Sequence, residues 1–208
     1  MMNRKAIPWS GMGAAFGMAL AIALAVLAVY GTGEKAIRTA LDITARWSFI
    51  LFWLAYAAGP LGVVFRPAFA GLARRGRDLG LAFAAAHLVH VGLVVWLGLI
   101  LNRVPLHGWL LWFFVAGLFF TYLLAALSFG AALLGQSLWR AIMFVAMNYI
   151  LIAFARDFFV GAIRAQELHR EGWRIADYSI LALLCIVAPL LRVAAAARRR
   201  GDMRPSPA

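Results

Sequence analysis

Two histidines three residues apart are the side chains of this sequence best suited to chemistry. His87 and His90 lie in the stretch Ala-Ala-Ala-His-Leu-Val-His, inside a long apolar run. A spacing of three residues places both imidazoles on one face of a helix. An imidazole in apolar surroundings needs a partner: a haem iron, a metal ion, or a hydrogen-bonding group on a neighbouring helix. The pair is therefore interpreted either as a cofactor or metal site, or as helix-joining residues that bond a Ser, Thr or carbonyl group.

The apolar run around the histidines is one of six that predict transmembrane helices. Of the 208 residues, 65% are apolar and 13% charged, and the mean hydropathy is +0.87. Soluble domains are about 45–50% apolar and about 25% charged. Runs of roughly 20 residues with few charges are long enough to cross a hydrocarbon layer of about 30 Å. The sequence predicts an all-α integral membrane protein, a single transmembrane domain over 1–208, with spans at 11–30, 47–65, 79–101, 110–134, 139–163 and 175–196.

The positions of the basic residues predict the orientation of these spans. The net charge is +12, and basic residues cluster where apolar runs stop, which indicates membrane topology rather than nucleic-acid binding. An N-terminus on the inside gives a basic cytoplasmic tail at 197–208 and puts 12 of the 20 basic residues inside: Arg4, Lys5, Arg66, Arg74, Arg75, Arg77, Arg140, Arg192, Arg198, Arg199, Arg200 and Arg204. We therefore expect both termini in the cytoplasm and the chain in a bacterial-type inner membrane.

Several kinds of site are excluded by what the sequence lacks. Cys185 is the single cysteine, so an intrachain disulfide, a cysteine-based zinc site and an iron–sulfur cluster are ruled out. The chain has no phosphate-binding glycine loop and no dinucleotide fingerprint. If the protein carries electrons, we expect it to take them from a separate flavoprotein or quinone.

The stretch from Arg74 to His90 resembles the third helix of ferric-reductase-like transmembrane domains. It has an arginine-rich loop, a Leu-Gly step at Gly80, and a histidine ten residues after that glycine. The family includes the haem-bearing membrane subunit of the bacterial methionine-sulfoxide reductase system. Residues 44–61 resemble its second helix and residues 134–140 the start of its fifth, so the likeness spans about 30–160. The resemblance implies a six-helix bundle with a b-type haem, and it gives His90 the role of haem ligand, with His87 beside it.

The fifth span departs from this family pattern. The family places histidines where this chain has Met143 and Arg156 or Asp157, and the fifth span contains no histidine. A methionine thioether can ligate haem iron, which makes Met143 a candidate. If spans three and five start level, however, Met143 lies about 10 Å along the helix axis from the depth of the histidines. The usual bis-histidine haem of the family is therefore not expected.

Three functions follow as hypotheses. The first is an oxidoreductase-type membrane subunit that transfers electrons from a separate donor through a b-type haem near His90. The second is a haem-less descendant of the same fold, acting as an accessory or assembly subunit for a partner membrane or periplasmic subunit. The third is a small metal-handling transporter that uses His87 and His90 as metal ligands.

Overall fold

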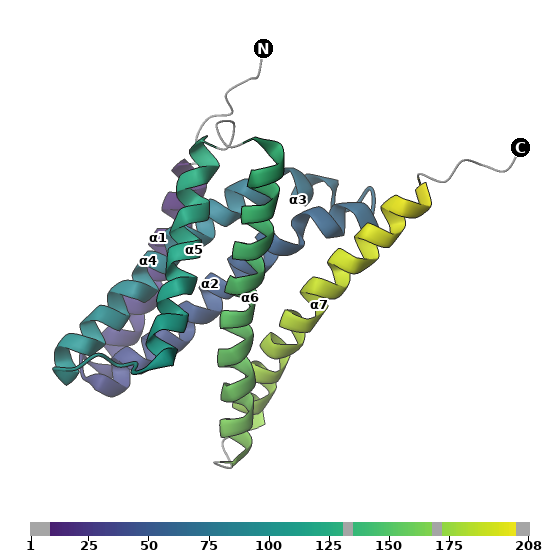
Figure 1. Cartoon of the computed structure of the whole chain (residues 1–208). Helices are drawn as coiled ribbons and strands as arrows, with labels where there is room; N and C mark the ends of the chain where they lie inside the picture. The colour runs from purple at the N-terminus through teal and green to yellow at the C-terminus, as the bar shows by residue number, and fades with distance from the viewer. Residues whose placement is uncertain (1–8, 131–134, 168–171, 203–208) are drawn as a thin grey trace, which may run out of the picture. The chain divides into compact units, whose positions relative to one another are not determined.

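The protein is built from helices joined by short turns. The computed structural model describes residues 9–130, 135–167 and 172–202, and no strand occurs among them. The helices follow one another along the chain as drawn in Figure 1: α1 Trp9–Tyr30, α2 Glu34–Val64, α3 Ala70–Arg74, α4 Gly76–Leu101, α5 Trp109–Gly130, α6 Gln136–Glu167 and α7 Gly172–Asp202.

The prediction of an all-α membrane bundle with six spanning helices is confirmed. Every helix except the five-residue α3 is long and apolar enough to cross a membrane. Each overlaps one predicted span. The last four residues of the span 110–134 lie outside the described part, as do residues 203–208 of the predicted tail. The part of the tail that is described, 197–202, continues α7 as helix.

The largest difference from the predicted boundaries is at the start of α2. This helix begins at Glu34, whereas the apolar span was predicted from residue 47. Gly31, at a φ of +80°, ends α1 with a hydrogen bond from its N–H to the Leu27 carbonyl. The new helix starts at once, and Glu34 pairs with Arg38 one turn later at 2.7 Å.

The chain divides into two compact units, which are described separately. The first comprises residues 1–55 and 77–111, and the second comprises 56–76 and 112–208. Because α2 runs from residue 34 to 64, it contributes its first part to one unit and its last part to the other. Whether both units form the single domain expected from the sequence stays a prediction.

In the first unit, α2 is joined to both α1 and α4. The indole of Trp47 on α2 donates a hydrogen bond to the Ala15 carbonyl on α1 at 3.2 Å. On the opposite partner, the rings of Phe52 and Phe83 meet edge to face with centroids 5.3 Å apart. Alanines dominate the buried part of α4, from Ala82 to Ala86 around Phe83. Small residues allow this close helix approach.

In the second unit, α5, α6, α7 and the end of α2 are linked by backbone contacts. The Tyr149 hydroxyl on α6 donates to the Phe113 carbonyl on α5 at 3.0 Å. The Arg198 guanidinium on α7 donates to the Val64 carbonyl at the end of α2 at 2.7 Å. Near the other end of α7, Tyr178 packs directly on Gly161 of α6.

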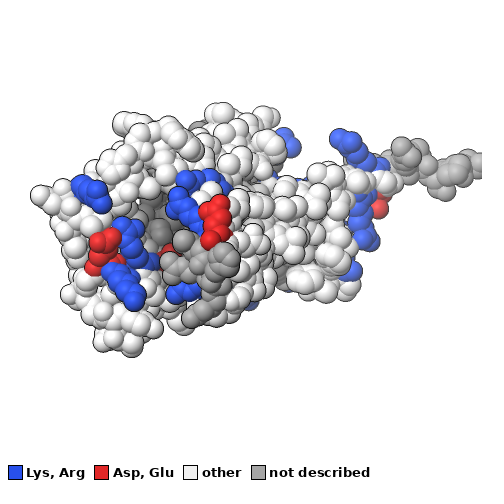
Figure 2. Space-filling view, turned by 90° about the horizontal axis from the view of Figure 1, so that it is seen from below, with Lys and Arg blue, Asp and Glu red and all other residues white. Residues whose placement is uncertain are grey.

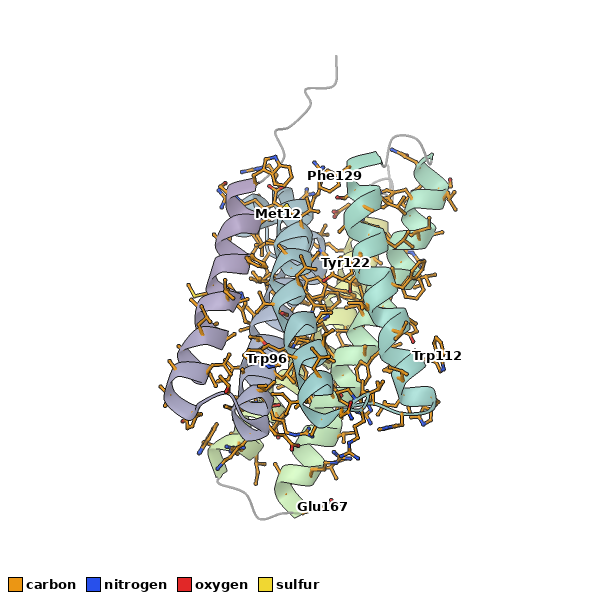
Figure 3. All side chains as sticks on the ribbon, turned by 90° about the vertical axis from the view of Figure 1, so that its left-hand side faces the viewer. Met12, Trp96, Trp112, Tyr122, Phe129 and Glu167 are labelled. Atoms are coloured by element: carbon orange, nitrogen blue, oxygen red, sulfur yellow. The ribbon has the colours of Figure 1, made fainter. Side chains whose placement is uncertain are left out.

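The outer surface is that of a lipid-facing protein. Large apolar side chains are exposed along the helices: Val29 and Leu99 are each 75% exposed, and Trp112, which points outward in Figure 3, is 71% exposed. Figure 2 shows a mainly uncharged face, with a basic group close to the C-terminal end of α7. Apolar exposure on this scale is stable only in a bilayer.

Candidate functional site

His90 is hydrogen-bonded across to α2. Its Nδ1 lies 3.3 Å from the Thr44 Oγ1, and the ring also bonds the backbone of Leu41, one turn away on the same helix. Thr44 is fully buried. This is the kind of Ser, Thr or carbonyl partner that the helix-joining interpretation predicted for these histidines.

The hydrogen bonds of Thr44 fix the tautomer of His90. The Thr44 hydroxyl has one hydrogen, which it donates to the Ala40 carbonyl at 2.8 Å, with the Leu41 carbonyl at 3.2 Å. Toward His90 the hydroxyl oxygen therefore accepts, so Nδ1 of the neutral imidazole carries the proton. Nε2 is left with the lone pair. This is the state of a histidine that binds a metal through Nε2 while a second group anchors its Nδ1–H.

His87 lies in a row of rings along α4. Its ring is nearly parallel to that of His90, with an interplanar angle of 15° and centroids 5.2 Å apart. Its other neighbour is Phe83 at 5.4 Å, which in turn contacts Phe52 on α2. The structure thus brings His87 and His90 together on one face, as their spacing predicted, and this face is the one that packs on α2.

Ser48 lies between Thr44 and Phe52 on the face of α2 that meets the histidine helix. Thr44 contacts His90, and Phe52 contacts Phe83, so antiparallel pairing puts Ser48 at the level of His87. Ser48 is fully buried, and its Oγ has no hydrogen-bond partner among the described residues. A buried hydroxyl without a partner costs about 1–3 kcal/mol. This residue is therefore a polar position beside the histidines that packing alone does not explain.

The remaining predicted site residue, Met143, is not brought to the histidines. It lies in the second turn of α6, in the second unit, and its side chain is 38% exposed. The residues at the second family position, Arg156 and Asp157, pair with each other at 2.9 Å, as their adjacency predicted. His90 is thus the one predicted ligand whose surroundings fit a haem iron.

The metal interpretation of the histidine pair gains less support. A zinc site needs three or four protein ligands. Within residues 9–130, 135–167 and 172–202, no group of three or more His, Cys, Asp or Glu side chains is placed to hold one ion. Nearly parallel rings also direct their in-plane nitrogen lone pairs alongside each other rather than toward one point.

The partners of the histidines on α2 were not identified from the sequence. Thr44 was noted only within the stretch that resembles the family's second helix, and Ser48 was not singled out. Their spacing was the available signal, because Thr44, Ser48 and Phe52 recur every four residues on one helical face. Which helix that face meets depends on tertiary packing.

Comparison with known proteins adds no relative. No family model, no curated protein and no solved structure matches the chain. The resemblance to ferric-reductase-like domains therefore stays a hypothesis based on the residues between 30 and 160, and the functional argument depends on the geometry around His90.

Proposed function

We propose that the protein is a membrane electron-transfer subunit in which Nε2 of His90 ligates a b-type haem. The observation that carries the proposal is the anchoring of Nδ1 by Thr44, 3.3 Å away on α2. A ligand histidine is oriented and made more basic in this way. No second axial ligand is assigned.

Each residue of the site has a role in this proposal. Thr44 holds the imidazole in one tautomer and one orientation. The rings of His87 and Phe83 shield His90 from water on its own helix. A bound haem would supply one-electron chemistry, and a separate flavoprotein or quinone would supply the electrons, because the sequence contains no nucleotide-binding motif. The bilayer would be the inner membrane.

The test is the optical spectrum of the full chain, expressed with ample haem and purified in detergent. We expect a Soret band with a reduced-minus-oxidised difference. His90→Ala should abolish it, and His87→Phe, which keeps a ring in the stack, should retain it. A colourless wild-type protein, or an unchanged spectrum in His90→Ala, contradicts the proposal.

A second function, a haem-less accessory subunit of a partner membrane complex, is favoured by the row of rings. Phe52, Phe83, His87 and His90 pack α2 on α4 by direct contacts. His90→Gln separates the two functions, since the glutamine amide can still donate to Thr44 but does not ligate haem. If the accessory function is correct, His90→Gln preserves activity and assembly. If the haem function is correct, both the spectrum and electron transfer are lost.

A further inference from the structure

A polar cluster in the second unit joins three helices. Arg192 of α7 lies over the ring of Tyr56 of α2, with its guanidinium carbon 3.7 Å from the ring centroid. The Tyr56 hydroxyl donates to Oδ1 of Asn148 on α6 at 2.9 Å, and the Asn148 amide donates to the Phe144 carbonyl at 2.6 Å. Tyr56 is only 2% exposed. Neither the sequence motifs nor the proposed haem site accounts for this cluster.

The cluster lies below the membrane surface. Arg198 bonds the Val64 carbonyl, so these two residues lie at the same level. Arg192 is six residues before Arg198, about 9 Å along α7, and Tyr56 is eight residues before Val64, about 12 Å along α2. A snorkelling arginine extends its head toward water. Arg192 instead places its guanidinium over Tyr56, on the membrane-interior side of its own backbone.

Arg192 also faces inward across α7. The buried residues of this helix, Leu181, Cys185, Ala188 and Ala195, recur at spacings of three and four, and Arg192 continues their series. The exposed residues Leu183, Leu190 and Val193 lie on the other side. Ala188 and Ala195 flank the arginine with small side chains and leave room beside it. A lipid-facing helix of a partner protein would therefore not meet this guanidinium.

The positive charge of Arg192 has no protein anion to balance it. Within the described residues, no carboxylate forms an ion pair with Arg192. Stacking on a tyrosine ring satisfies one face of the guanidinium but none of its five N–H donors. An intramembrane arginine in this position marks a functional site by default.

We propose that Arg192, with Tyr56 and Asn148, binds the carboxylate of a long-chain, membrane-soluble ligand of the fatty-acid class. A carboxylate matches the planar donor fork of arginine and neutralises its charge. The phosphate of a phospholipid remains in the headgroup layer and is too shallow for this depth. A single-chain carboxylic acid enters the hydrocarbon layer as the neutral acid and releases its proton to the aqueous phase on pairing with the guanidinium.

The test measures binding of cis-parinaric acid to the full chain in nanodiscs, by energy transfer from its tryptophans. We expect a saturable component, absent for the methyl ester of the same probe. Arg192→Gln should weaken this component at least tenfold, which corresponds to about 1.4 kcal/mol. Arg192→Lys should give an intermediate value because it keeps the charge and loses the fork.

Arg198→Gln is the matched control, because it removes another arginine of α7 that bonds only a backbone carbonyl. Its affinity should stay within twofold of the wild type. Equal affinity for acid and methyl ester, or displacement of the probe by phosphatidylglycerol at equal concentration, overturns the proposal. So does unchanged binding in Arg192→Gln, which would leave Arg192 as a helix-packing residue. If Arg192→Gln does not fold, the comparison of acid with ester on the wild type decides. The site is independent of the proposed haem function, so either can fail alone.

Discussion

The hydroxyl of Thr44 controls how His90 is presented. Its hydrogen is donated to the Ala40 carbonyl, and its oxygen receives the Nδ1–H of His90, so one buried side chain sets both tautomer and ring orientation. The same hydroxyl is a helix-joining contact, for which membrane hydrogen bonds are worth about 0.6–2 kcal/mol. Haem retention and helix packing can therefore be separated by variants at this one position.

Thr44→Val keeps the shape of the side chain and removes the acceptor for Nδ1–H. If His90 ligates haem, we expect haem affinity to fall about 10–100-fold, as for other losses of a ligand-orienting partner. Haem-to-protein ratio after purification, and the midpoint potential of what remains, are the measurements. Thr44→Ser retains the hydroxyl and should behave like the wild type. Equal haem content and potential in Thr44→Val and the wild type would show that the contact only packs the helices.

The kind of partner for His90 was predictable from the sequence, and its identity was not. A histidine in an apolar helix requires a polar partner, and Ser or Thr on a neighbouring helix is a common one. Selecting Thr44 requires the register of α2 against α4. That register is set by the ring contact of Phe52 with Phe83 and by the small residues between them, which no local pattern reveals.

Among the helices, α2 shows where an apolar-run criterion fails. Glu34, Arg38 and Arg46 make its first part too polar to count as a membrane span. The buried positions Ala36, Ile37, Ala40 and Thr44 nevertheless follow helical spacing. The prediction of a connector at 31–46 was therefore wrong in its structure, although it left room for a short helix. Six spans were predictable because length and charge alone define them.

The contact of α6 with α7 depends on a glycine. A Cβ added at Gly161 would lie 2.6 Å from Cδ1 and Cε1 of the Tyr178 ring. We expect Gly161→Ala to destabilise the protein by about 1–3 kcal/mol, the usual cost of overpacking. Thermal or SDS-induced unfolding in mixed micelles measures this loss.

Two variants test the cause of that loss. Gly92→Ala on α4 is the control, since a Cβ there meets nothing within 4 Å, and its stability should change little. Tyr178→Ala combined with Gly161→Ala should restore more than the sum of the two single changes predicts. Additive losses would mean that the two residues do not clash.

At the scale of the whole molecule, the arrangement of charge across the membrane is still a prediction. The helices establish that the chain crosses the membrane six times, and the basic residues alone indicate that the loop before α4 lies inside. The chain is convenient for a labelling test because its single cysteine, Cys185, is only 5% exposed.

In a Cys185→Ala background, Gly33→Cys and Gly71→Cys report on opposite sides. Both positions are exposed, and an added Cβ meets nothing within 4 Å at either. In intact spheroplasts, a membrane-impermeant maleimide should label Gly33→Cys, and it should label Gly71→Cys only after permeabilisation. The reverse pattern would place the termini outside. Labelling of both positions in intact cells would contradict the six-span topology.

The early start of α2 has a consequence for proteases acting from outside the cell. Lys35, Arg38 and Arg46 are tryptic sites in a segment that the sequence suggests is a connector, yet all three lie within continuous helix. A protease needs an extended strand of about a dozen residues, so cleavage there requires local unfolding of a helix whose inner face is buried by Ile37 and Ala40. Trypsin added to right-side-out membranes should therefore leave this segment intact for as long as the helix holds, and cutting should begin only when heat or detergent loosens it.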